Sequence, residues 1–333
     1  MLATNMDVDK TSVLAGAVRS HQRNYSPSAD YYIVGFLFPT QESQMQIVRS
    51  HDQLIKTAAF ASMAVATLLL LVKLGIWWLS GSTSVLSSML DSLMDIVASV
   101  INFFAIRYAL MPADDDHPFG HSKAEGIAAL IQAAFIAGSV TILLLHVSER
   151  LLNPQPLQAL PESLAVMLFS TLLTLVLVGY QRWVVKQTGS LAVKADSEHY
   201  ASDILINLAV VVALLGAYLG VDWLDPCIAL LIALILLRSV YSIAKLALGV
   251  LMDEALADDQ EREIKEIILS QPGVKGVHDL KTRQAGSVQF IQFHLELDGQ
   301  QPLLQAHQAG EKVNLAIQQC FPRAEILIHQ DPV

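Results

Sequence analysis

The sequence predicts an α-helical membrane protein with six transmembrane helices, followed by a small soluble domain of helices and strands. Of the 333 residues, 53% are hydrophobic and only 16% are charged. The mean hydropathy of +0.46 is too high for an ordinary soluble domain. Six apolar stretches are each long enough to cross about 30 Å of hydrocarbon at about 1.5 Å per residue. From about residue 251 the composition becomes that of a soluble domain, so we expect three regions: 1–45, 46–250 and 251–333.

The first region, 1–45, is polar and lacks both a signal-peptide core and a sustained hydrophobic period. Such a composition is typical of segments that cannot bury enough apolar surface to fold. We therefore expect a disordered extension. Met45 is an alternative start, and the sequence leaves both starts open.

The second region contains the six apolar stretches, which are separated by turn-like segments rich in Gly, Pro, Ser and Asp. Basic residues flank the second and fourth connections and the final exit more than the other connections. The positive-inside rule then places both termini in the cytoplasm, and an even number of spans agrees with this orientation. The predicted spans are approximately 54–79, 83–110, 122–152, 162–188, 197–220 and 225–250.

The third region alternates between helical and strand periodicity. The order helix, strand, strand, helix, strand predicts a small open α+β sheet with its helices on one face. The predicted helices are 258–270 and 303–321, and the predicted strands are 277–283, 288–297 and 324–329.

Two carboxylates lie four residues apart within the second apolar stretch, at Asp91 and Asp95. On a helix this spacing places both side chains on one face, one turn apart. An ionised Asp near the bilayer centre costs about 2.5 to 3.5 kcal/mol on insertion scales, so an acidic pair there marks an ion or proton pathway by default. The alternative is that the pair snorkels to an interface or caps a short re-entrant helix.

His199 and Asp203 repeat the four-residue spacing on the fifth stretch. With Asp91 and Asp95 they offer four ligands from two helices, which suits a tetrahedral divalent metal ion, zinc first. Alone, His199 is more simply a hydrogen-bonded helix histidine, but the matched pairs favour a metal site. Polar stripes on both helices support this arrangement, and we expect them to line a wet cavity. The stripes are Ser84, Ser88, Asp91, Asp95, Ser99 and Asn102, and Asp196, His199, Asp203 and Asn207.

A second group of candidate ligands lies in the loop after the second stretch. Asp114, His117 and His121 fall within eight residues of one another. Aspartate and histidine at such short spacing can close around a metal ion, but a short charged loop is also what an ordinary cytoplasmic turn contains. Spacing alone leaves these two interpretations equal.

The soluble region holds a third group. Four of the ten histidines, His278, His294, His307 and His329, lie there, and Asp331 follows the last of them by two residues. If the final strand joins the sheet, His329 and Asp331 converge with His278 and His294, and Asp331 could bridge two ions. The alternative is a set of unrelated surface histidines.

The sequence lacks the features of several other classes. It contains no HExxH, GxSxG or P-loop pattern, so neither a zinc hydrolase nor an ATP-driven motor is indicated. The formal net charge of -10 and the lack of a Lys/Arg-rich run argue against nucleic-acid binding. Cys227 and Cys320 form no CxxC element, so neither a disulfide framework nor a thiolate zinc site is indicated.

With these residues in place, the sequence resembles the cation diffusion facilitator family, and within it the bacterial zinc and ferrous-iron efflux pumps. The resemblance covers about residues 46–333 and rests on Asp-x3-Asp, His-x3-Asp, the loop Asp-x2-His-x3-His and the C-terminal Ile-His-Gln-Asp-Pro. It implies three metal sites. They are a transport site of Asp91, Asp95, His199 and Asp203, a loop site of Asp114, His117 and His121, and a cytoplasmic two-metal site of His278, His294, His307, His329 and Asp331.

The resemblance also implies a ferredoxin-like, metallochaperone-like cytoplasmic domain that joins two protomers into a homodimer. Bound Zn²⁺ would then be structural in that domain as well as transported. Lys123 and Asp253 match positions that pair near the dimer interface in this family, although charges at helix ends are an ordinary alternative. The extension departs from the family pattern, and nothing is carried onto it.

The expected function is secondary active transport in a bacterial inner membrane. A divalent cation, Zn²⁺ first with Cd²⁺ and Fe²⁺ as alternatives, would leave the cytoplasm in exchange for protons. Metal binding needs neutral His199 and ionised aspartates, so protonation of the same groups releases the ion. The competing class is a metal-gated channel or metal-sensing membrane protein without coupled transport, and a membrane metallohydrolase ranks third. No enzyme activity, organic cofactor or nucleic-acid partner is expected.

Overall fold

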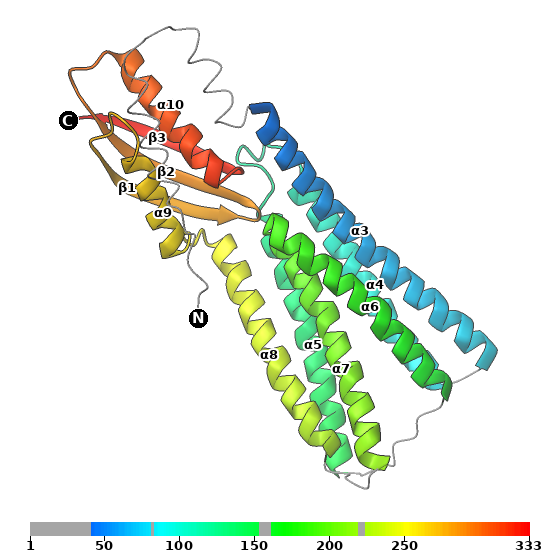
Figure 1. Ribbon diagram of the computed structural model, residues 1–333. Coiled ribbons are helices and arrows are strands. Elements are labelled where there is room, and N and C mark those ends of the chain that lie inside the picture. Colours follow the sequence, from blue (N-terminus) through cyan, green and yellow to red (C-terminus); the bar gives the residue numbers. More distant parts are fainter. Residues whose placement is uncertain (1–40, 81–82, 153–160, 219–223) are drawn as a thin grey trace, which may run out of the picture. The chain divides into compact units, whose positions relative to one another are not determined.

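The computed structural model describes residues 41–80, 83–152, 161–218 and 224–333. Within the predicted membrane region it contains six long helices, labelled as in Figure 1. They are α3 (Gln41–Ser80), α4 (Thr83–Ala109), α5 (Ala124–Leu152), α6 (Pro161–Thr188), α7 (Leu191–Tyr218) and α8 (Leu224–Leu251).

Five of these helices have the length and composition expected of a membrane span. The remaining helix, α7, has 28 residues and corresponds to the fifth predicted span, 197–220, but it is not among those five. Six long helices therefore lie near the predicted positions, but only five of the described helices satisfy the criteria for spanning, so the count of six spans stays a prediction. The qualifying segments are Val48–Leu79, Asp91–Ala109, Ala124–Glu149, Leu164–Thr188 and Pro226–Leu251.

The start of α3 differs from the prediction. The sequence predicts a disordered extension over 1–45, whereas α3 begins at Gln41 and so includes residues 41–45. Residues 1–40, which make up the rest of that predicted extension, lie outside the described part of the chain.

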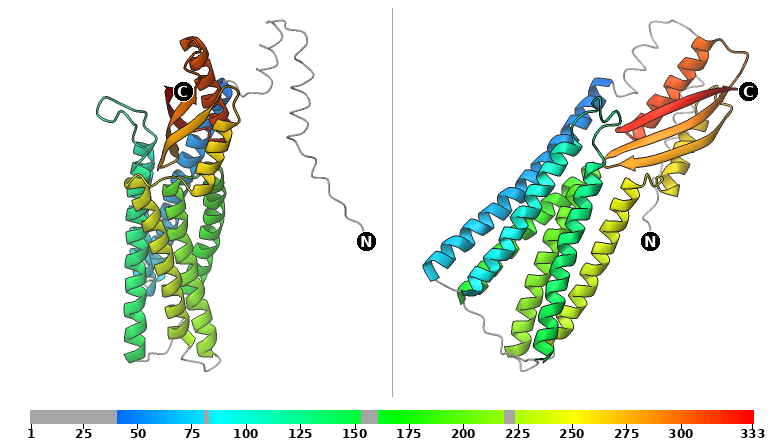
Figure 2. Two further views of the ribbon diagram at one scale, coloured as in Figure 1. Left: turned by 90° about the vertical axis from the view of Figure 1, so that its left-hand side faces the viewer. Right: turned by 180° about the vertical axis from the view of Figure 1, so that it is seen from behind.

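Helices α5, α7 and α8 pack together along much of their length (Figures 1 and 2). Their shared core is rich in alanine, including Ala133 on α5, Ala195 on α7 and Ala233 on α8. Small side chains allow membrane helices to approach closely, because association there depends on packing rather than on exclusion of water. Large apolar side chains such as Phe104 and Leu172 are exposed on α4 and α6, where they suit a hydrocarbon environment.

The soluble region forms a three-stranded sheet with two helices packed against it. Strand β2 is central, pairing antiparallel with β1 and parallel with β3. The observed order matches the predicted helix, strand, strand, helix, strand. The elements are α9 (Asp258–Leu269), β1 (Gly276–Ala285), β2 (Val288–Leu297), α10 (Leu303–Cys320) and β3 (Ala324–Pro332).

Alternation along β2 decides which face of the sheet is covered. Ile291, Phe293 and Leu295 are buried and join a core with α9 and α10, which lie on the same side of the sheet in Figure 2. Residues between them, including His294, point to the opposite face, because successive strand residues alternate. The fold class is thus confirmed as a helical membrane region followed by a small α+β domain.

Candidate metal sites

The first candidate site lies between α4 and α7. Asp95 on α4 and His199 and Asp203 on α7 each place one ligand atom within 4.8 Å of the others. Asp91 lies one turn before Asp95 on α4, is exposed, and is not a member of this group. The structure therefore brings three of the four predicted transport ligands together, with the fourth on the neighbouring turn.

His199 is the central residue of this site. Its side chain is nearly inaccessible, and within the described chain neither ring nitrogen has a hydrogen-bond partner. Its Nε2 lies 3.4 Å from Asp95 Oδ1, which is an ion-pair distance without hydrogen-bond geometry. A buried polar group without a hydrogen bond is costly, and an imidazole facing two carboxylates has the donor set of a divalent metal site. The residues present therefore fit a metal ion as substrate.

A network of buried polar side chains surrounds the site. Tyr200 on α7 is hydrogen-bonded to Ser99 on α4, with 2.6 Å between the hydroxyl oxygens. Asp196, also on α7, accepts hydrogen bonds from the side-chain amides of Gln181 at 2.6 Å and Gln132 at 3.2 Å. These contacts tie α7 to α4, α5 and α6, and so hold the helix that carries His199 in place.

This network corrects one expectation about the polar stripes. The stripe pattern predicts that Ser99, Asn102 and Asp196 line a wet cavity, but each is only 1% exposed. Asp196 is satisfied by two amide donors on neighbouring helices and needs no water there. Gln132 and Gln181 were not singled out, although a glutamine inside an apolar stretch is a visible signal of such a contact.

The loop site is formed by Asp114, His117 and His121, whose ligand atoms also lie within 4.8 Å of one another. His117 Nδ1 is 3.2 Å from Asp114 Oδ1, and His121 Nε2 is 3.4 Å from Asp114 Oδ2. The backbone N–H of His117 donates to Asp114 and lowers the pKa of that carboxyl, which keeps it ionised as a ligand must be. His121 is buried against the ring of Tyr108, whereas the other two residues are exposed.

The cytoplasmic cluster is a row of histidines across the sheet. His278 on β1 pairs directly with His294 on β2, and His294 pairs with His329 on β3. Residues opposite one another on adjacent strands share a face, so all three rings meet on the uncovered side of the sheet. Strand β3 extends beyond its predicted end, and this places Asp331 in the sheet as well.

Asp331 lies between the three rings. Its Oδ2 is 2.8 Å from His294 Nδ1 and 3.3 Å from His278 Nε2, while its Oδ1 is 3.1 Å from His329 Nε2. The hydrogen bond that it accepts from His294 lowers the pKa of Asp331. One carboxylate oxygen faces His278 and His294 and the other faces His329, which suits a carboxylate that bridges two ions. Histidine nitrogens and a carboxylate are also ligands that zinc accepts.

The residues near this cluster differ from the predicted set: His307 is not among them, and two acidic residues that the sequence did not single out are. His307 lies exposed on α10, and its membership in the cytoplasmic site stays a prediction. Glu296 is 2.8 Å from His278 Nδ1, and its position two residues after His294 on the same strand could have revealed it. Asp279, whose Oδ2 is 3.9 Å from His294 Nε2, sits at a bulge with φ of 49°, which no sequence period shows.

Lys123 and Asp253 are paired, as the family resemblance implied. Lys123 Nζ at the start of α5 is 3.0 Å from the Asp253 carboxylate, which follows α8. Arg283 on β1 also reaches Asp253, at 2.9 Å, and stacks over the ring of Phe290. The hydrogen bond from Arg283, followed by that from Lys123, lowers the pKa of Asp253.

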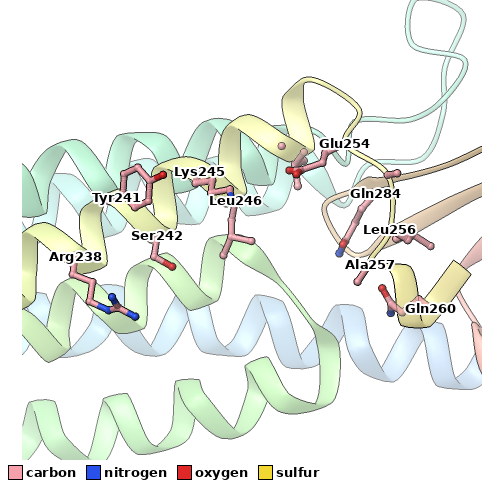
Figure 3. A pocket seen from close by; sticks show the side chains of 13 residues that line it. Arg238, Tyr241, Ser242, Lys245, Leu246, Glu254, Leu256, Ala257, Gln260 and Gln284 are labelled. Carbon is pink, nitrogen blue, oxygen red and sulfur yellow. The ribbon is translucent and has the colours of Figure 1, made fainter.

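A cavity of about 560 Å³ lies beside the C-terminal half of α8 (Figure 3). Its lining includes Arg238 and Lys245 on α8, Glu254 after it, and Gln284 on β1. No predicted metal ligand lines it. The cavity is therefore separate from the three candidate sites.

Comparison with known proteins assigns both regions. Residues 59–252 match the model of the cation efflux transmembrane domain, and residues 256–333 match that of the cation efflux protein cytoplasmic domain. The chain is 45% identical over 285 residues to the cation-efflux pump FieF of Cronobacter sakazakii, covering 85% of this chain and 95% of that one. It is 46% identical over 282 residues to FieF of Serratia proteamaculans, covering 85% and 94%.

Among solved structures, the zinc form of a putative zinc transporter CzrB is 34% identical, with a TM-score of 0.23, and covers 24% of this chain and 92% of that one. The family is established by the domain matches and the two full-length relatives, which together span both the membrane helices and the sheet described above. This chain is a multi-pass membrane protein that belongs to the cation efflux family, also called the cation diffusion facilitator family.

Proposed function

We propose that this protein exports a divalent metal cation, Zn²⁺ first, from the cytoplasm in exchange for protons. The observation that carries the proposal is the group of two half-buried carboxylates, Asp95 and Asp203, around the buried His199, whose imidazole has no hydrogen-bond partner in the described chain. The location is the bacterial inner membrane, with both termini in the cytoplasm, as the distribution of basic residues favours.

The chemistry of these ligands accounts for coupling to protons. Asp91, one turn from Asp95, supplies the fourth ligand of a tetrahedral site. A metal ion binds to ionised carboxylates and neutral imidazole, and protons compete for the same lone pairs. The site therefore holds either the metal ion or protons, and alternating access to the two sides of the membrane would convert this competition into exchange.

The choice among metals follows from the ligand types. Two or three carboxylates and one imidazole suit Zn²⁺ or Cd²⁺, and Fe²⁺ is also compatible with oxygen and nitrogen ligands. Zinc is our first assignment because its preferred tetrahedral geometry matches the four ligands. Competition among these ions in one transport assay ranks them.

The loop and cytoplasmic clusters are proposed as further zinc sites. The cytoplasmic ligands His278, His294, His329 and Asp331, with His307, would hold two ions on the uncovered face of the sheet. In a homodimer formed through this domain, bound metal would stabilise the folded and assembled state, because any ligand that binds only that state shifts the equilibrium toward it.

Reconstitution in liposomes tests the proposal. We expect Zn²⁺ flux that follows an imposed proton gradient, and we expect Asp95→Ala and His199→Ala to reduce it to the background of empty liposomes. Glu198→Gln is the matched control, because Glu198 precedes His199 on α7 and instead accepts a hydrogen bond from Ser239 on α8. Flux that survives His199→Ala would contradict the site. Flux that ignores the proton gradient would contradict exchange and favour a metal-gated channel.

A further inference from the structure

One buried charge near the transport site has no role in the function proposed above. Lys73 lies on α3 within the membrane-spanning segment Val48–Leu79, and it is 8% exposed. A lysine is rarely buried in this way, because removing an ammonium group from water is costly unless its charge and its donors are matched. The contacts of Lys73 show how both are matched.

The ammonium group is held by α4. Lys73 Nζ donates one hydrogen bond to the backbone oxygen of Ser88 at 2.9 Å and another to the hydroxyl of Ser92 at 2.7 Å. Ser92 lies between the two carboxylates of this helix, next to Asp91 and three residues before Asp95. The hydrogen bonds therefore fix the positive charge beside the acidic turn of α4.

The charge of Lys73 is matched by the transport ligands themselves. Its hydrogen bond to Ser92 places the ammonium group next to Asp91 and less than one turn from Asp95, and Asp95 shares the site with Asp203. These are the three acidic ligands proposed for the transported ion. The lysine thus belongs to the site electrostatically, although it lies on a different helix from every ligand.

A count of charges shows what this lysine does. The three carboxylates carry three negative charges, while Lys73 supplies one positive charge and a divalent cation supplies two, so the occupied site is neutral. Without Lys73 the same site would keep one negative charge after binding a divalent ion. At low effective dielectric such an excess charge strengthens the hold on any cation and slows its release.

We propose that Lys73 is a resident cation of the transport site, which lowers its affinity for divalent metal ions enough to permit rapid release. The inference rests on the proposed function, since it takes Asp91, Asp95 and Asp203 as ligands. Lys73 is a positioning and charge-setting residue and does not coordinate the ion.

A purely structural role for Lys73 predicts the opposite change in metal affinity. If Lys73 only tied α3 to α4 through Ser88 and Ser92, its loss would loosen the acidic turn and weaken metal binding. If it sets the charge, its loss strengthens metal binding and slows turnover. The direction of the change in affinity therefore separates the two roles.

Three substitutions isolate the charge from the hydrogen bonds. Lys73→Gln keeps N–H donors for Ser88 and Ser92 but removes the charge, Lys73→Met removes both, and Lys73→Arg keeps both. Lys56→Met is the matched control, because Lys56 is a second lysine on α3, exposed and seventeen residues before Lys73. Each variant is purified as the full chain and reconstituted, and the KM and maximal rate for Zn²⁺ are measured at a fixed alkaline pH, where proton competition is smallest.

For Lys73→Gln and Lys73→Met we expect the KM for Zn²⁺ to fall on the order of tenfold or more, together with a lower maximal rate. Lys73→Arg and Lys56→Met should stay within about twofold of the unaltered protein, as expected when the charge at position 73 is kept. An unchanged or raised KM in Lys73→Gln would overturn the inference, and because this variant retains the donors, it decides the question even if Lys73→Met does not fold.

Failure of this inference is distinguishable from failure of the proposed function. If Asp95→Ala and His199→Ala abolish flux while Lys73→Gln leaves the KM unchanged, the transport site stands and only the resident cation is refuted. If those two ligand variants keep normal flux, the site itself is wrong, and the inference about Lys73 is overturned with it.

Discussion

At the scale of single residues, His199 carries a conflict between stability and function. It is buried between α4 and α7, yet neither ring nitrogen is hydrogen-bonded within the described residues. An unsatisfied buried polar group costs about 1 to 3 kcal/mol relative to a satisfied one. This unfavourable burial occurs at the position where coordination to a metal ion would satisfy the imidazole.

We therefore expect His199→Leu to stabilise the metal-free protein while abolishing transport. Leucine has a similar volume and removes two ring nitrogens that lack hydrogen bonds, and this gain should exceed the loss of the 3.4 Å ion pair with the partly exposed Asp95. Thermal unfolding with a chelator present should therefore occur at a higher temperature than in the unaltered protein. Asp196→Leu, three residues earlier, is the contrasting control: Asp196 accepts two amide hydrogen bonds, and its loss should destabilise the protein by about 1 to 3 kcal/mol. A lower unfolding temperature for His199→Leu would show that the histidine is structurally satisfied.

At the scale of elements, the start of α7 depends on a residue from another helix. Glu125 on α5 is 1% exposed, and one of its oxygens accepts hydrogen bonds from Ser190 Oγ at 2.7 Å and from the Leu191 backbone N–H at 2.9 Å. Backbone N–H groups at a helix N-terminus have no partner inside the helix, and a carboxylate satisfies them well. The cap fixes the end of the helix that carries His199 and Asp203.

The expected effect of Glu125→Gln is a loss of about 1 to 2 kcal/mol of stability, because the amide accepts fewer and weaker hydrogen bonds than the carboxylate it replaces. Zn²⁺ transport should fall with it, through displacement of α7 rather than loss of a ligand. Hydrogen exchange at Leu191 and Ala192 is the direct measurement, and it should become faster. The exposed Glu311 on α10 provides the control in Glu311→Gln, which should change neither quantity.

The sheet illustrates how an element assembles a site. Pairing of β2 with both neighbours brings His278, His294 and His329 into one row, although they span about fifty residues of sequence. Their rings lie close together, with centroids 5.0 Å apart for the first pair and 4.6 Å for the second. In the absence of metal such a row offers no packing benefit comparable to a core contact.

Removal of metal should therefore lower the stability of the cytoplasmic domain by the amount that zinc binding to these three histidines contributes. Saturating Zn²⁺ at one hundred times the dissociation constant should stabilise the cytoplasmic domain by about 2.7 kcal/mol per site, and a chelator should reverse this. His294→Ala should remove most of the zinc-dependent increase in unfolding temperature while leaving the metal-free protein little changed, since His294 is not part of the core. An undiminished zinc effect in this variant would mean that the stabilising ion binds elsewhere.

At the scale of the whole molecule, the sequence predicted the elements better than their contacts. Hydropathy located all six long helices to within a few residues at most ends, because burial in lipid imposes a long continuous apolar run. Strand alternation located β2 at 288–297 with both ends correct. The helix start at Leu191 was missed by six residues, because the cap that fixes it comes from Glu125, far away in the sequence.

Some residues of the candidate sites could be found from sequence spacing, and others depend on contacts between elements. Four-residue spacings identified Asp95, His199 and Asp203, since a helix converts spacing into a shared face. Lys73 shows no such period, and its importance depends on how α3 packs against α4. Asp279 depends on a β-bulge, which is a property of the pairing rather than of either strand.

Charged contacts join the membrane helices and the cytoplasmic domain at two places: Arg323 pairs with Asp52 on α3 at 2.9 Å, and a cluster surrounds Asp253. Asp253, after α8, is contacted by Lys123, which immediately precedes α5, and by Arg283 from β1. Its backbone has φ of 58°, a left-handed conformation that asparagine and aspartate tolerate better than other side chains. Asp253→Asn therefore removes the charge without adding backbone strain, whereas Asp253→Ala would do both.

Stability measured against pH tests this cluster. Its two cationic partners lower the pKa of Asp253 from 3.8, so the carboxylate contributes stability that is present above about pH 4 and is lost as pH falls through the lowered value. At neutral pH we expect Asp253→Asn to cost on the order of 1 kcal/mol or less, because the cluster is partly exposed and screened. The difference between the two proteins should vanish in acid. A difference independent of pH would contradict this assignment, because it would show that the stability lost in Asp253→Asn does not come from the charge of Asp253.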